Sequence, residues 1–331
     1  MEDRNQGPGV SCAIDEDILE GYRKKIPEVA EKIIESCYEQ KCNSHIDYEP
    51  MPSRASVINV IDEFLKIIFP GYFTSAKIDP ANLKFHMGWC VTRFFSMLAE
   101  QVISSIRHDC LRNNLTCQEC NEKGYEISLN ALKELSSLRD ILAWDVQAAY
   151  DGDPAAGSYD EIIYSYPGIF AIAVYRLAHL LYEYNVPLLP RIMTEYAHSK
   201  TGIDIHPGAQ IDERFVIDHG TGVVIGETAT IGKNVRIYQG VTIGALSLPQ
   251  EAGAQLRGKK RHPDIEDDVI IYSGAMILGG NTTIGARSVI GGNVWLTESV
   301  PPDTQVFLKK PQLVYENGKE KHRFLIEDYS I

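Results

Sequence analysis

The chain has 331 residues, of which 44% are hydrophobic, so it is long enough for two domains with an apolar core. A formal net charge of −13 makes the chain as a whole a poor binder of nucleic acid, although local cations can still hold a phosphate. No apolar run reaches the length of a membrane span, and the polar N-terminus lacks the pattern of a secretory signal. We therefore expect a cytoplasmic protein that binds neither nucleic acid nor a membrane.

The cysteines all lie in the first part of the chain, before residue 121. Their uneven spacing in a long chain does not resemble a disulfide scaffold and suits a reducing compartment. One subset could bind zinc at plausible spacing, namely His108, Cys110, Cys117 and Cys120. A single C-x-x-C pair with irregular partners is a modest signal, so ordinary reduced thiols are the preferred interpretation and no metal site is predicted.

Up to about residue 195 the apolar residues recur at helical spacing. The segments with this pattern are 57–68, 94–106, 128–150 and 169–184. Ser128 is a plausible N-cap for the third segment, and Pro70-Gly71 ends the first. These segments predict an α-helical N-terminal domain.

From residue 203 the period of the aliphatic residues changes to six. The positions are Ile205, Ile211, Ile217 and Val223, then Ile225, Ile231, Ile237 and Ile243, then Ile265, Ile271 and Ile277, then Ile284, Ile290 and Leu296. Neither an α-helix nor an alternating strand has this period, whereas a hexapeptide β-helix does. In such a triangular prism each unit supplies one short strand and one corner, and the coils stack through parallel strand pairing.

Residues 245–262 interrupt the repeat and are expected to form a loop at one corner, where functional sites tend to lie. The repeats are expected to stop after Pro301-Pro302. We therefore predict an α+β protein with three parts. They are an α-helical N-terminal domain over residues 1–195, a parallel β-helix of hexapeptide repeats over 196–310, and a flexible tail over 311–331.

Three short clusters within the repeat region carry groups suited to base-assisted acyl transfer. They are Asp204-Ile205-His206-Pro207, Asp218-His219-Gly220-Thr221-Gly222 and Arg261-His262-Pro263. The offset between the first two clusters is close to one coil, so residues on successive coils become neighbours. The prism is associated with acyl transfer from coenzyme A, but a fold alone does not establish a function.

Over residues 145–305 the sequence resembles the serine O-acetyltransferases almost throughout. Besides the three clusters, the matching stretches are Asp145-Val146-Gln147-Ala148, Asp153-Pro154-Ala155, Tyr175-Arg176-Leu177-Ala178-His179 and Gly226-Glu227-Thr228-Ala229. The resemblance implies a left-handed β-helix and transfer of acetyl from acetyl-CoA to the L-serine hydroxyl, giving O-acetyl-L-serine and CoA. It also implies that acetyl-CoA is a co-substrate, that no cofactor is tightly bound, and that L-cysteine inhibits by occupying the serine site.

The resemblance assigns the general base to His219, which would take the hydroxyl proton as serine attacks the thioester. It places Asp204 where a carboxylate would hold the imidazole tautomer and stabilise the imidazolium. A lone histidine in such a corner is more often a surface residue, and Asp204 can instead bond a turn backbone. His206 is left as a structural or supporting residue.

For the substrates, the resemblance places the serine ammonium at Asp153 and Asp218. Arg261 suits the serine carboxylate because its fork binds carboxylates bidentately, and His262 would help to position serine. The residues implied for CoA binding along the outside of the prism are Gly244, Ala245, Ser273, Gly274, Lys259 and Lys260. For both lysines, simple solvation is the competing interpretation.

The resemblance also implies a homo-trimer, with each active site between neighbouring prisms, or a dimer of trimers. The acidic tail ends at Ile331, and a C-terminal isoleucine of this family inserts into the active site of O-acetylserine sulfhydrylase. A plain disordered tail is the alternative.

Three other functions stay open. One is an acetyl-CoA-dependent acetyltransferase of a sugar or another amino acid, which would not be expected to share Asp153-Pro154-Ala155 and Arg261-His262-Pro263. Another is a γ-class carbonic anhydrase, which needs three zinc-binding histidines between subunits. The last is a non-catalytic scaffold that regulates the sulfhydrylase, against which His219 and Asp204 argue.

Overall fold

The structure is a computed structural model. It describes residues 16–38, 51–113, 116–246, 256 and 258–309, without the side chains of 109–113, and every statement below concerns that part. By compactness the chain divides into two units, Met1–Glu49 and Pro50–Ile331. None of the described helices is long and apolar enough to cross a membrane.

The first unit contains two amphipathic helices, α1 (Glu16–Arg23) and α2 (Ile26–Tyr38). In α2 the apolar residues Ile26, Val29 and Ile33 follow helical spacing, yet all three are exposed.

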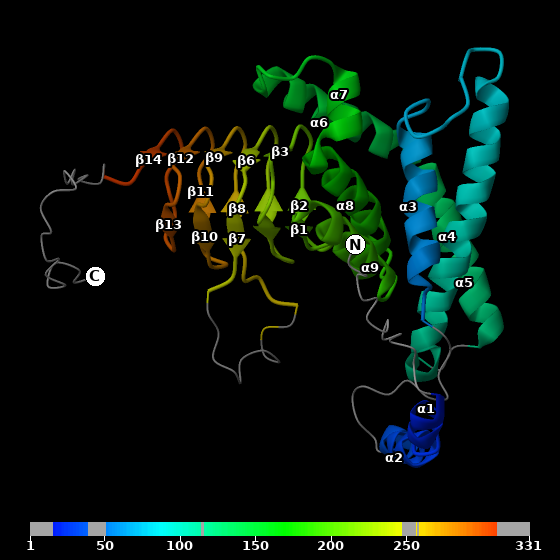
Figure 1. Ribbon diagram of the computed structural model, residues 1–331. Helices are drawn as coiled ribbons and strands as arrows, with labels where there is room; N and C mark the ends of the chain where they lie inside the picture. The colour runs from blue at the N-terminus through cyan, green and yellow to red at the C-terminus, as the bar shows by residue number, and fades with distance from the viewer. Residues whose placement is uncertain (1–15, 39–50, 114–115, 247–255, 257, 310–331) are drawn as a thin grey trace, which may run out of the picture. The chain divides into compact units, whose positions relative to one another are not determined.

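Helices of the second unit precede a region of short strands (Figure 1). They are α3 (Arg54–Ile68), α4 (Leu83–Asn113), α5 (Cys117–Lys133), α6 (Leu135–Gly152), α7 (Tyr159–Ser165), α8 (Pro167–Glu183) and α9 (Leu189–Thr201). Side chains cap several of them, since Ser53 accepts from the Ser56 amide and Thr116 forms a capping box with Glu119. The helices predicted over 57–68, 94–106 and 169–184 are confirmed as α3, α4 and α8.

The start of the third predicted helix was wrong. Ser128 is not an N-cap but a fully buried residue inside α5, where its hydroxyl donates to the Gly124 carbonyl at 2.8 Å. The helical pattern continues through Glu134, where α5 ends and α6 begins. Apolar spacing alone does not reveal such a break, because both helices bury a stripe against the same core.

After α9 the described chain forms short parallel β-strands of two or three residues, joined by turns. They are β1 (Asp204–Ile205), β2 (Gln210–Ile211), β3 (Val216–Asp218), β4 (Val224–Ile225), β5 (Thr230–Ile231), β6 (Arg236–Tyr238), β7 (Thr242–Gly244), β8 (Asp264–Ile265), β9 (Ile270–Ile271), β10 (Met276–Leu278), β11 (Thr283–Ile284), β12 (Val289–Ile290), β13 (Trp295–Leu296) and β14 (Gln305–Val306).

In the described part these strands make three sheets. Their orders are β1-β4-β7-β10-β13, β11-β8-β5-β2 and β14-β12-β9-β6-β3. The first sheet aligns Ile205, Ile225, Ile243 and Ile277, which are all buried along the axis. Every third strand therefore returns to the same sheet, which confirms the predicted parallel β-helix of hexapeptide repeats.

The repeat has the predicted interruption but not the predicted end. β7 ends at Gly244 and β8 begins at Asp264, so the inserted loop leaves the corner between these strands; its residues 247–255 and 257 lie outside the described part. Beyond Pro301-Pro302, β14 still pairs in parallel with β12. The prolines did not stop the repeat because they lie in the corner before β14, where no ladder bond from their nitrogen is needed.

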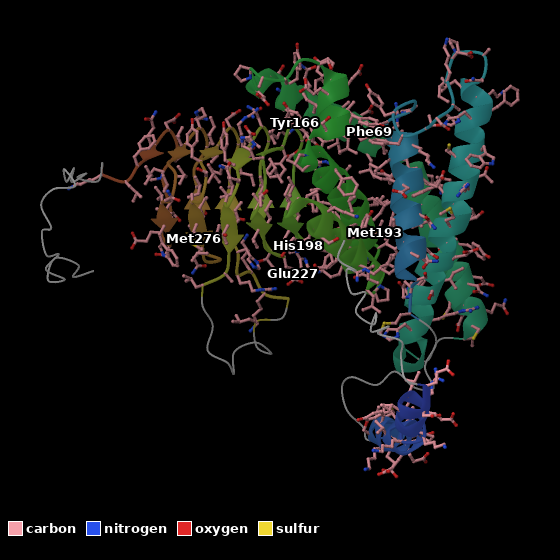
Figure 2. The ribbon with its side chains drawn as sticks, in the orientation of Figure 1. Phe69, Tyr166, Met193, His198, Glu227 and Met276 are labelled. Carbon is pink, nitrogen blue, oxygen red and sulfur yellow. The ribbon has the colours of Figure 1, made fainter. Side chains whose placement is uncertain are left out.

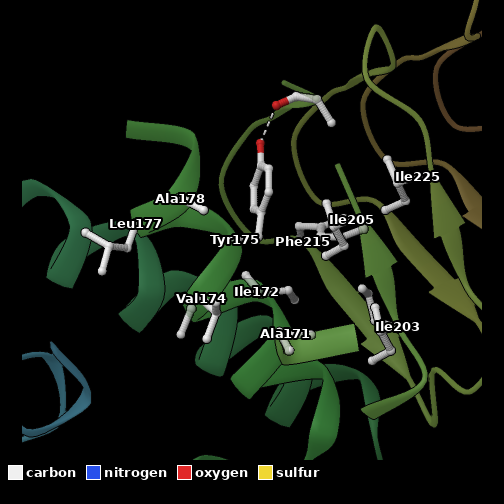
Figure 3. Close-up of a cluster of buried hydrophobic side chains, with 14 of the residues drawn as sticks. Ala171, Ile172, Val174, Tyr175, Leu177, Ala178, Ile203, Ile205, Phe215 and Ile225 are labelled. Carbon is white, nitrogen blue, oxygen red and sulfur yellow. Dashed lines mark hydrogen bonds between the residues drawn. The ribbon is translucent and has the colours of Figure 1, made fainter. Parts of the chain in front are cut away.

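Helix α8 covers the end of the solenoid at which β1 lies (Figure 1). Figure 3 shows Ile172 and Tyr175 of α8 facing Ile203, Ile205 and Phe215 of the first coil. The buried Tyr175 hydroxyl donates to the Ala209 carbonyl at 2.6 Å. Helix and solenoid thus share one apolar core.

A buried ion pair fixes this junction. Arg176 of α8 binds Asp145 of α6 through two hydrogen bonds of 2.7 and 3.0 Å, and the Phe215 amide donates to the same carboxylate at 2.9 Å. The last helix ends at Thr201 and β1 begins at Asp204. The division of the chain at residues 195 and 310 stays a prediction, since compactness groups residues 50–331 into one unit.

Candidate active site

The corner that follows β3 carries His219 and is longer than the corners above it. Eight positions separate Ile217 from Ile225, whereas six separate Ile237 from Ile243 one coil later. The two additional residues project His219 outward in the left-handed region, with φ 56°, and its side chain is 76% exposed. Its Nε2 lies 3.8 Å from Oδ1 of Asp218.

Helices α6 and α8 supply a wall beside this corner. Asp153 caps the end of α6, and its Oδ2 accepts a hydrogen bond of 2.6 Å from the Tyr166 hydroxyl. That bond is the main reason why the pKa of Asp153 lies below its usual value, and the charges of Arg236 and His219 act in the same direction. Asp153 is therefore ionised and can attract a cation.

Arg236 of β6 completes this group. Its Nη1 lies 4.0 Å from Oδ2 of Asp218, and its Nη2 donates to the Ala148 carbonyl at 2.8 Å. We call Asp153, Tyr166, Asp218, His219 and Arg236 the Asp218 corner. It brings together three of the predicted site residues: Asp153, Asp218 and His219.

Asp204 does not join them directly. Its Oδ1 accepts a hydrogen bond of 3.4 Å from Nη1 of Arg191 on α9, and across the described residues no hydrogen bond links it to His219. Burial lowers the pKa of His206, and the negative charge of Asp204 acts in the opposite direction on that imidazole.

Arg261 and His262 lie at another corner, between the sheets of β1 and β2. The Arg261 guanidinium pairs with the Glu227 carboxylate, which also accepts from the Tyr182 hydroxyl at 3.1 Å. Burial by itself raises the pKa of Glu227. The hydrogen bond from Arg261 opposes this effect, and the pKa lies below its usual value. We call His206, Glu227, Thr228, Arg261 and His262 the Arg261 corner.

Thr228 organises this corner. Its Oγ1 accepts from the amides of Arg261 and His262 at 2.9 and 3.0 Å, and its own amide donates to Nδ1 of His262 at 3.0 Å. His262 is 7% exposed and packs on Gly226, where a Cβ atom would lie 2.1 Å from its Nε2. A glycine is therefore required beside this imidazole.

The two imidazoles of the Arg261 corner are neutral. Burial, followed by the charge of Arg261, lowers the pKa of His262 to about 4, and burial also lowers the pKa of His206. Nδ1 of His206 accepts from the Gly208 amide at 3.0 Å, so in both rings Nδ1 is an acceptor and Nε2 carries the proton. Both can donate to a substrate oxygen.

The two corners lie apart. In the view of Figure 2, Tyr166 lies at one side of the solenoid and Glu227 at the opposite side. No hydrogen bond or ion pair between described residues connects the Asp218 corner with the Arg261 corner. A single chain therefore presents the predicted substrate residues as two separate groups.

The predicted CoA residues are spread along the same prism. Ser273 and Gly274 lie two coils beyond His219 at the same edge, whereas Gly244 is the last residue of β7 and Ala245 follows it. The Gly274 amide already donates to the Gln239 carbonyl at 2.9 Å. Because a Cβ there would lie 2.3 Å from the Asn293 side chain, this glycine is needed for stacking of the coils.

The two lysines differ. Nζ of Lys260 donates to the Thr228 carbonyl at 2.7 Å and pairs with Asp264, which ties it to the Arg261 corner. Lys259 is exposed, and no ion pair involves its side chain within the described ranges. Lys259 is therefore the more available of the two for a phosphate.

Sequence reasoning missed Tyr166, Arg236 and the roles of Glu227 and Thr228. Tyr166 precedes α8 and Arg236 lies one coil above Asp218, so neither is near its partner in sequence. Glu227 and Thr228 belong to the stretches that carry the family resemblance, but the sequence alone assigns them no role. Their position directly after the glycine of a repeat was the available signal.

A metal site has one geometric candidate among the described side chains, formed by Glu195, His198 and Asp204. Arg191 forms ion pairs with both of its carboxylates, so the site already contains a cation. The alternative zinc set includes the Cys110 side chain, which lies outside the described residues, and it stays untested.

Comparison with known proteins identifies what this arrangement resembles. No protein-family model matches the chain. A plasmid serine acetyltransferase of Synechococcus elongatus is 44% identical over 274 residues, 82% of this chain and 85% of that protein. The serine acetyltransferase of Bacillus subtilis is 44% identical over 185 residues, 56% of this chain and 81% of that protein.

Solved structures agree with these relatives. Entamoeba histolytica serine acetyltransferase 1, in complex with L-cysteine, has a TM-score of 0.67 and 36% identity, and the match covers 87% of this chain and 100% of that one. Soybean serine acetyltransferase complexed with serine has a TM-score of 0.50 and 28% identity, with 80% and 100% covered. With 44% identity over most of both sequences, this chain belongs to the serine acetyltransferase family.

Proposed function

We propose that this protein transfers the acetyl group of acetyl-CoA to the hydroxyl of L-serine, giving O-acetyl-L-serine and CoA. The observation that carries the proposal is the 44% identity to a serine acetyltransferase over 82% of the chain. The groups at the two corners are suited to an amino-acid substrate, because they include both carboxylates and a guanidinium. The reaction would be the first step from serine toward cysteine.

His219 is the proposed general base. Its imidazole would accept the serine hydroxyl proton while the oxygen attacks the thioester carbon, forming the new C–O bond. Collapse of the tetrahedral intermediate would break the C–S bond, and the imidazolium would return its proton to the CoA thiolate. An exposed ring on a projecting corner can reach such a substrate, and Asp218 lies within 3.8 Å to stabilise the imidazolium.

Serine would bind with its ammonium between Asp153 and Asp218, which flank His219 in the Asp218 corner. Its carboxylate would meet Arg261, with the Nε2–H of His262 as a further donor. Asp204 is the proposed orienting acid for His219, as the family resemblance implies. Since Asp204 bonds Arg191 in this chain, that role requires its carboxylate to turn toward His219 when the site is assembled.

The separation of the two corners supports a homo-trimer, alone or as a dimer of trimers. In a ring of prisms, the Asp218 corner of one chain would face the Arg261 corner of its neighbour, because one chain holds these groups on different edges of the same prism. Each substrate site would then need two chains.

Acetyl-CoA would lie along the prism edge beyond His219, past Ser273 and Gly274 and near Gly244 and Ala245, with no tightly bound cofactor. Of the two loop lysines, Lys259 would meet its phosphates, with Lys260 beside it. L-Cysteine differs from L-serine in one atom and would inhibit by taking the same ionic contacts. The Entamoeba relative is solved in complex with L-cysteine, which supports this assignment.

We also propose that Ile331 inserts into the active site of O-acetylserine sulfhydrylase; this residue lies outside the described part of the chain. Deletion of Ile331 should then abolish that binding, and unchanged affinity would refute it. The cytoplasm is the proposed compartment, because unevenly spaced cysteines in a long chain suit a reducing environment.

One assay tests the activity itself. The full chain is incubated with acetyl-CoA and a panel of amino acids and sugars, and thiol release is measured. Serine should be acetylated well ahead of the rest. Preference for a sugar or for another amino acid would refute the proposal.

A further inference from the structure

A hollow of about 340 Å³ lies between α3, the α7–α8 connection and α9. Its size falls within the range of small-molecule pockets, which is roughly 300–1,000 Å³. The walls are largely apolar and aromatic, and include Phe69, Phe73, Ile169, Phe170 and Tyr196. Figure 2 shows Phe69 at the end of α3 and Tyr166 before α8, two residues that line the hollow from different elements.

Stacked rings shape one side of the hollow. Phe73 and Tyr164 lie parallel within 9°, with centroids 5.7 Å apart, and Phe170 meets Tyr196 edge to face at 6.3 Å. Flat walls of this kind fit a planar apolar group, because aromatic pairs favour stacked and edge-to-face contacts.

The charged group in the lining is a lysine. Nζ of Lys200 lies 5.6 Å above the Tyr196 ring, and no ion pair within the described ranges occupies it. Burial and, after it, the negative charge of Asp62 raise the pKa of Tyr196, so a carboxylate also acts on this wall. The positive charge of Lys66 counters that of Asp62. An aromatic wall with an available cation at its edge suits a ligand that combines a ring with a carboxylate.

The hollow connects to the Asp218 corner through one residue. Tyr166 lines the hollow, and its hydroxyl donates to Oδ2 of Asp153 at 2.6 Å. The hydrogen bond to Asp153 raises the pKa of Tyr166 to about 12, so the hydroxyl stays protonated and continues to donate. A molecule in the hollow would therefore touch the residue that holds the proposed ammonium-binding carboxylate.

We propose that this hollow binds small aromatic carboxylates and that its occupancy is coupled through Tyr166 to serine binding at Asp153. The binding site follows from the lining of the hollow alone. The coupling rests on the proposed function, because it assumes that Asp153 receives serine.

Binding is tested by calorimetric titration of the full chain with 3-phenylpropanoate, compared with its uncharged amide. We expect saturable binding of the carboxylate, weaker binding of the amide, and a loss of about threefold to fivefold in Lys200→Met. Lys123→Met, which removes an exposed lysine on α5, is the matched control and should bind as the wild type does. Absence of saturable binding, or equal affinity in Lys200→Met, would overturn the site.

Coupling is tested by repeating the titration with and without saturating L-serine. Serine should change the affinity for 3-phenylpropanoate by about fivefold, and the probe should change the affinity for serine by the same factor, since coupling is reciprocal. Tyr166→Phe keeps the ring in the wall and removes the hydroxyl, so this variant should still bind the probe but lose the coupling. No effect of serine in the wild type, or the same effect in Tyr166→Phe, would overturn the link.

The two proposals fail in different ways. If serine does not bind the wild-type chain without the probe, the proposed function is wrong and the coupling falls with it. The titration with 3-phenylpropanoate still decides whether the hollow is a binding site, because it does not depend on serine.

Discussion

The Asp218 corner and the Arg261 corner both carry a histidine, but they hold it in opposite environments. His219 projects from a lengthened turn and is 76% exposed, whereas His262 is 7% exposed and held by Thr228. A base must meet its substrate and exchange a proton, which suits an accessible ring flanked by carboxylates. A neutral donor that only orients a substrate is better fixed and buried.

This difference shows how one prism can carry both a reactive group and a separate set of groups that orient the substrate. The reactive group is placed by two additional residues in its corner, since the next corner at the same edge of the prism spans only six positions, from Ile237 to Ile243. The orienting groups are placed by tight packing on Gly226 and by the hydrogen bonds of Thr228. Variants at each corner should therefore fail differently.

The largest effect is expected for His219→Ala. Loss of a positioned general base should lower kcat by about 10²- to 10⁴-fold, with little change in folding because the side chain is exposed. Thiol release measured with saturating serine and acetyl-CoA checks this. His198→Ala, which removes a partly exposed histidine from α9, is the control. Comparable activity losses in both variants would deny the base a special role.

Asp145→Ala should weaken the junction between the solenoid and helices α6 and α8, which form the wall beside the Asp218 corner. The change leaves Arg176 buried without its carboxylate partner, which is expected to reduce the free energy of unfolding by about 3–5 kcal/mol. Urea denaturation measures it. The exposed pair of Arg287 and Asp303 provides the comparison, since solvent screens this pair and Asp303→Ala should cost far less. Equal costs would show that the buried pair does not secure this junction.

Thr228→Ala should affect the Arg261 corner alone. It removes the acceptor for two backbone amides and should displace both Arg261 and His262, which raises KM for serine by about 5- to 100-fold. We expect the value of kcat to change less, because His219 is untouched. Thr230→Ala, on the exposed face of β5, is the control. A fall in kcat with an unchanged KM would contradict the division between the corners.

The smallest effect concerns pH. Because the folded-state pKa of His262 is about 4 and its ordinary value is 6.5, the unfolded chain binds the extra proton between these values. The contribution of this group to stability is therefore complete above pH 6.5 and decreases as the pH falls toward 4. One proton accounts for at most about 1.4 kcal/mol per pH unit.

Denaturation between pH 4 and 7.5 tests the assignment. His262→Gln should reduce the slope of unfolding free energy against pH in this window, while part of the slope remains because the pKa of His206 is also lowered. His198→Gln serves as the control. An unchanged slope in His262→Gln would mean that the buried ring is not held neutral by the fold.

Several features could be predicted because they depend on neighbours in sequence. Aliphatic residues at a period of six have only one regular way to face a common axis, so the coils and the stacking of Ile205 on Ile225 followed from spacing. The helices α3, α4 and α8 followed from their apolar stripes in the same way. The break at Glu134 and the strand β14 did not, because packing and pairing determine them.

The sequence by itself determined the β-helix, its interrupted corner and the residues that resemble a serine acetyltransferase. Only the tertiary structure decided that Asp153 meets Tyr166, that Asp204 bonds Arg191, and that Arg261 and His262 lie away from His219. The physical reason is that a repeat period sets which residues face inward. Contacts between outward-facing side chains depend on how helices and coils pack, which no local spacing specifies.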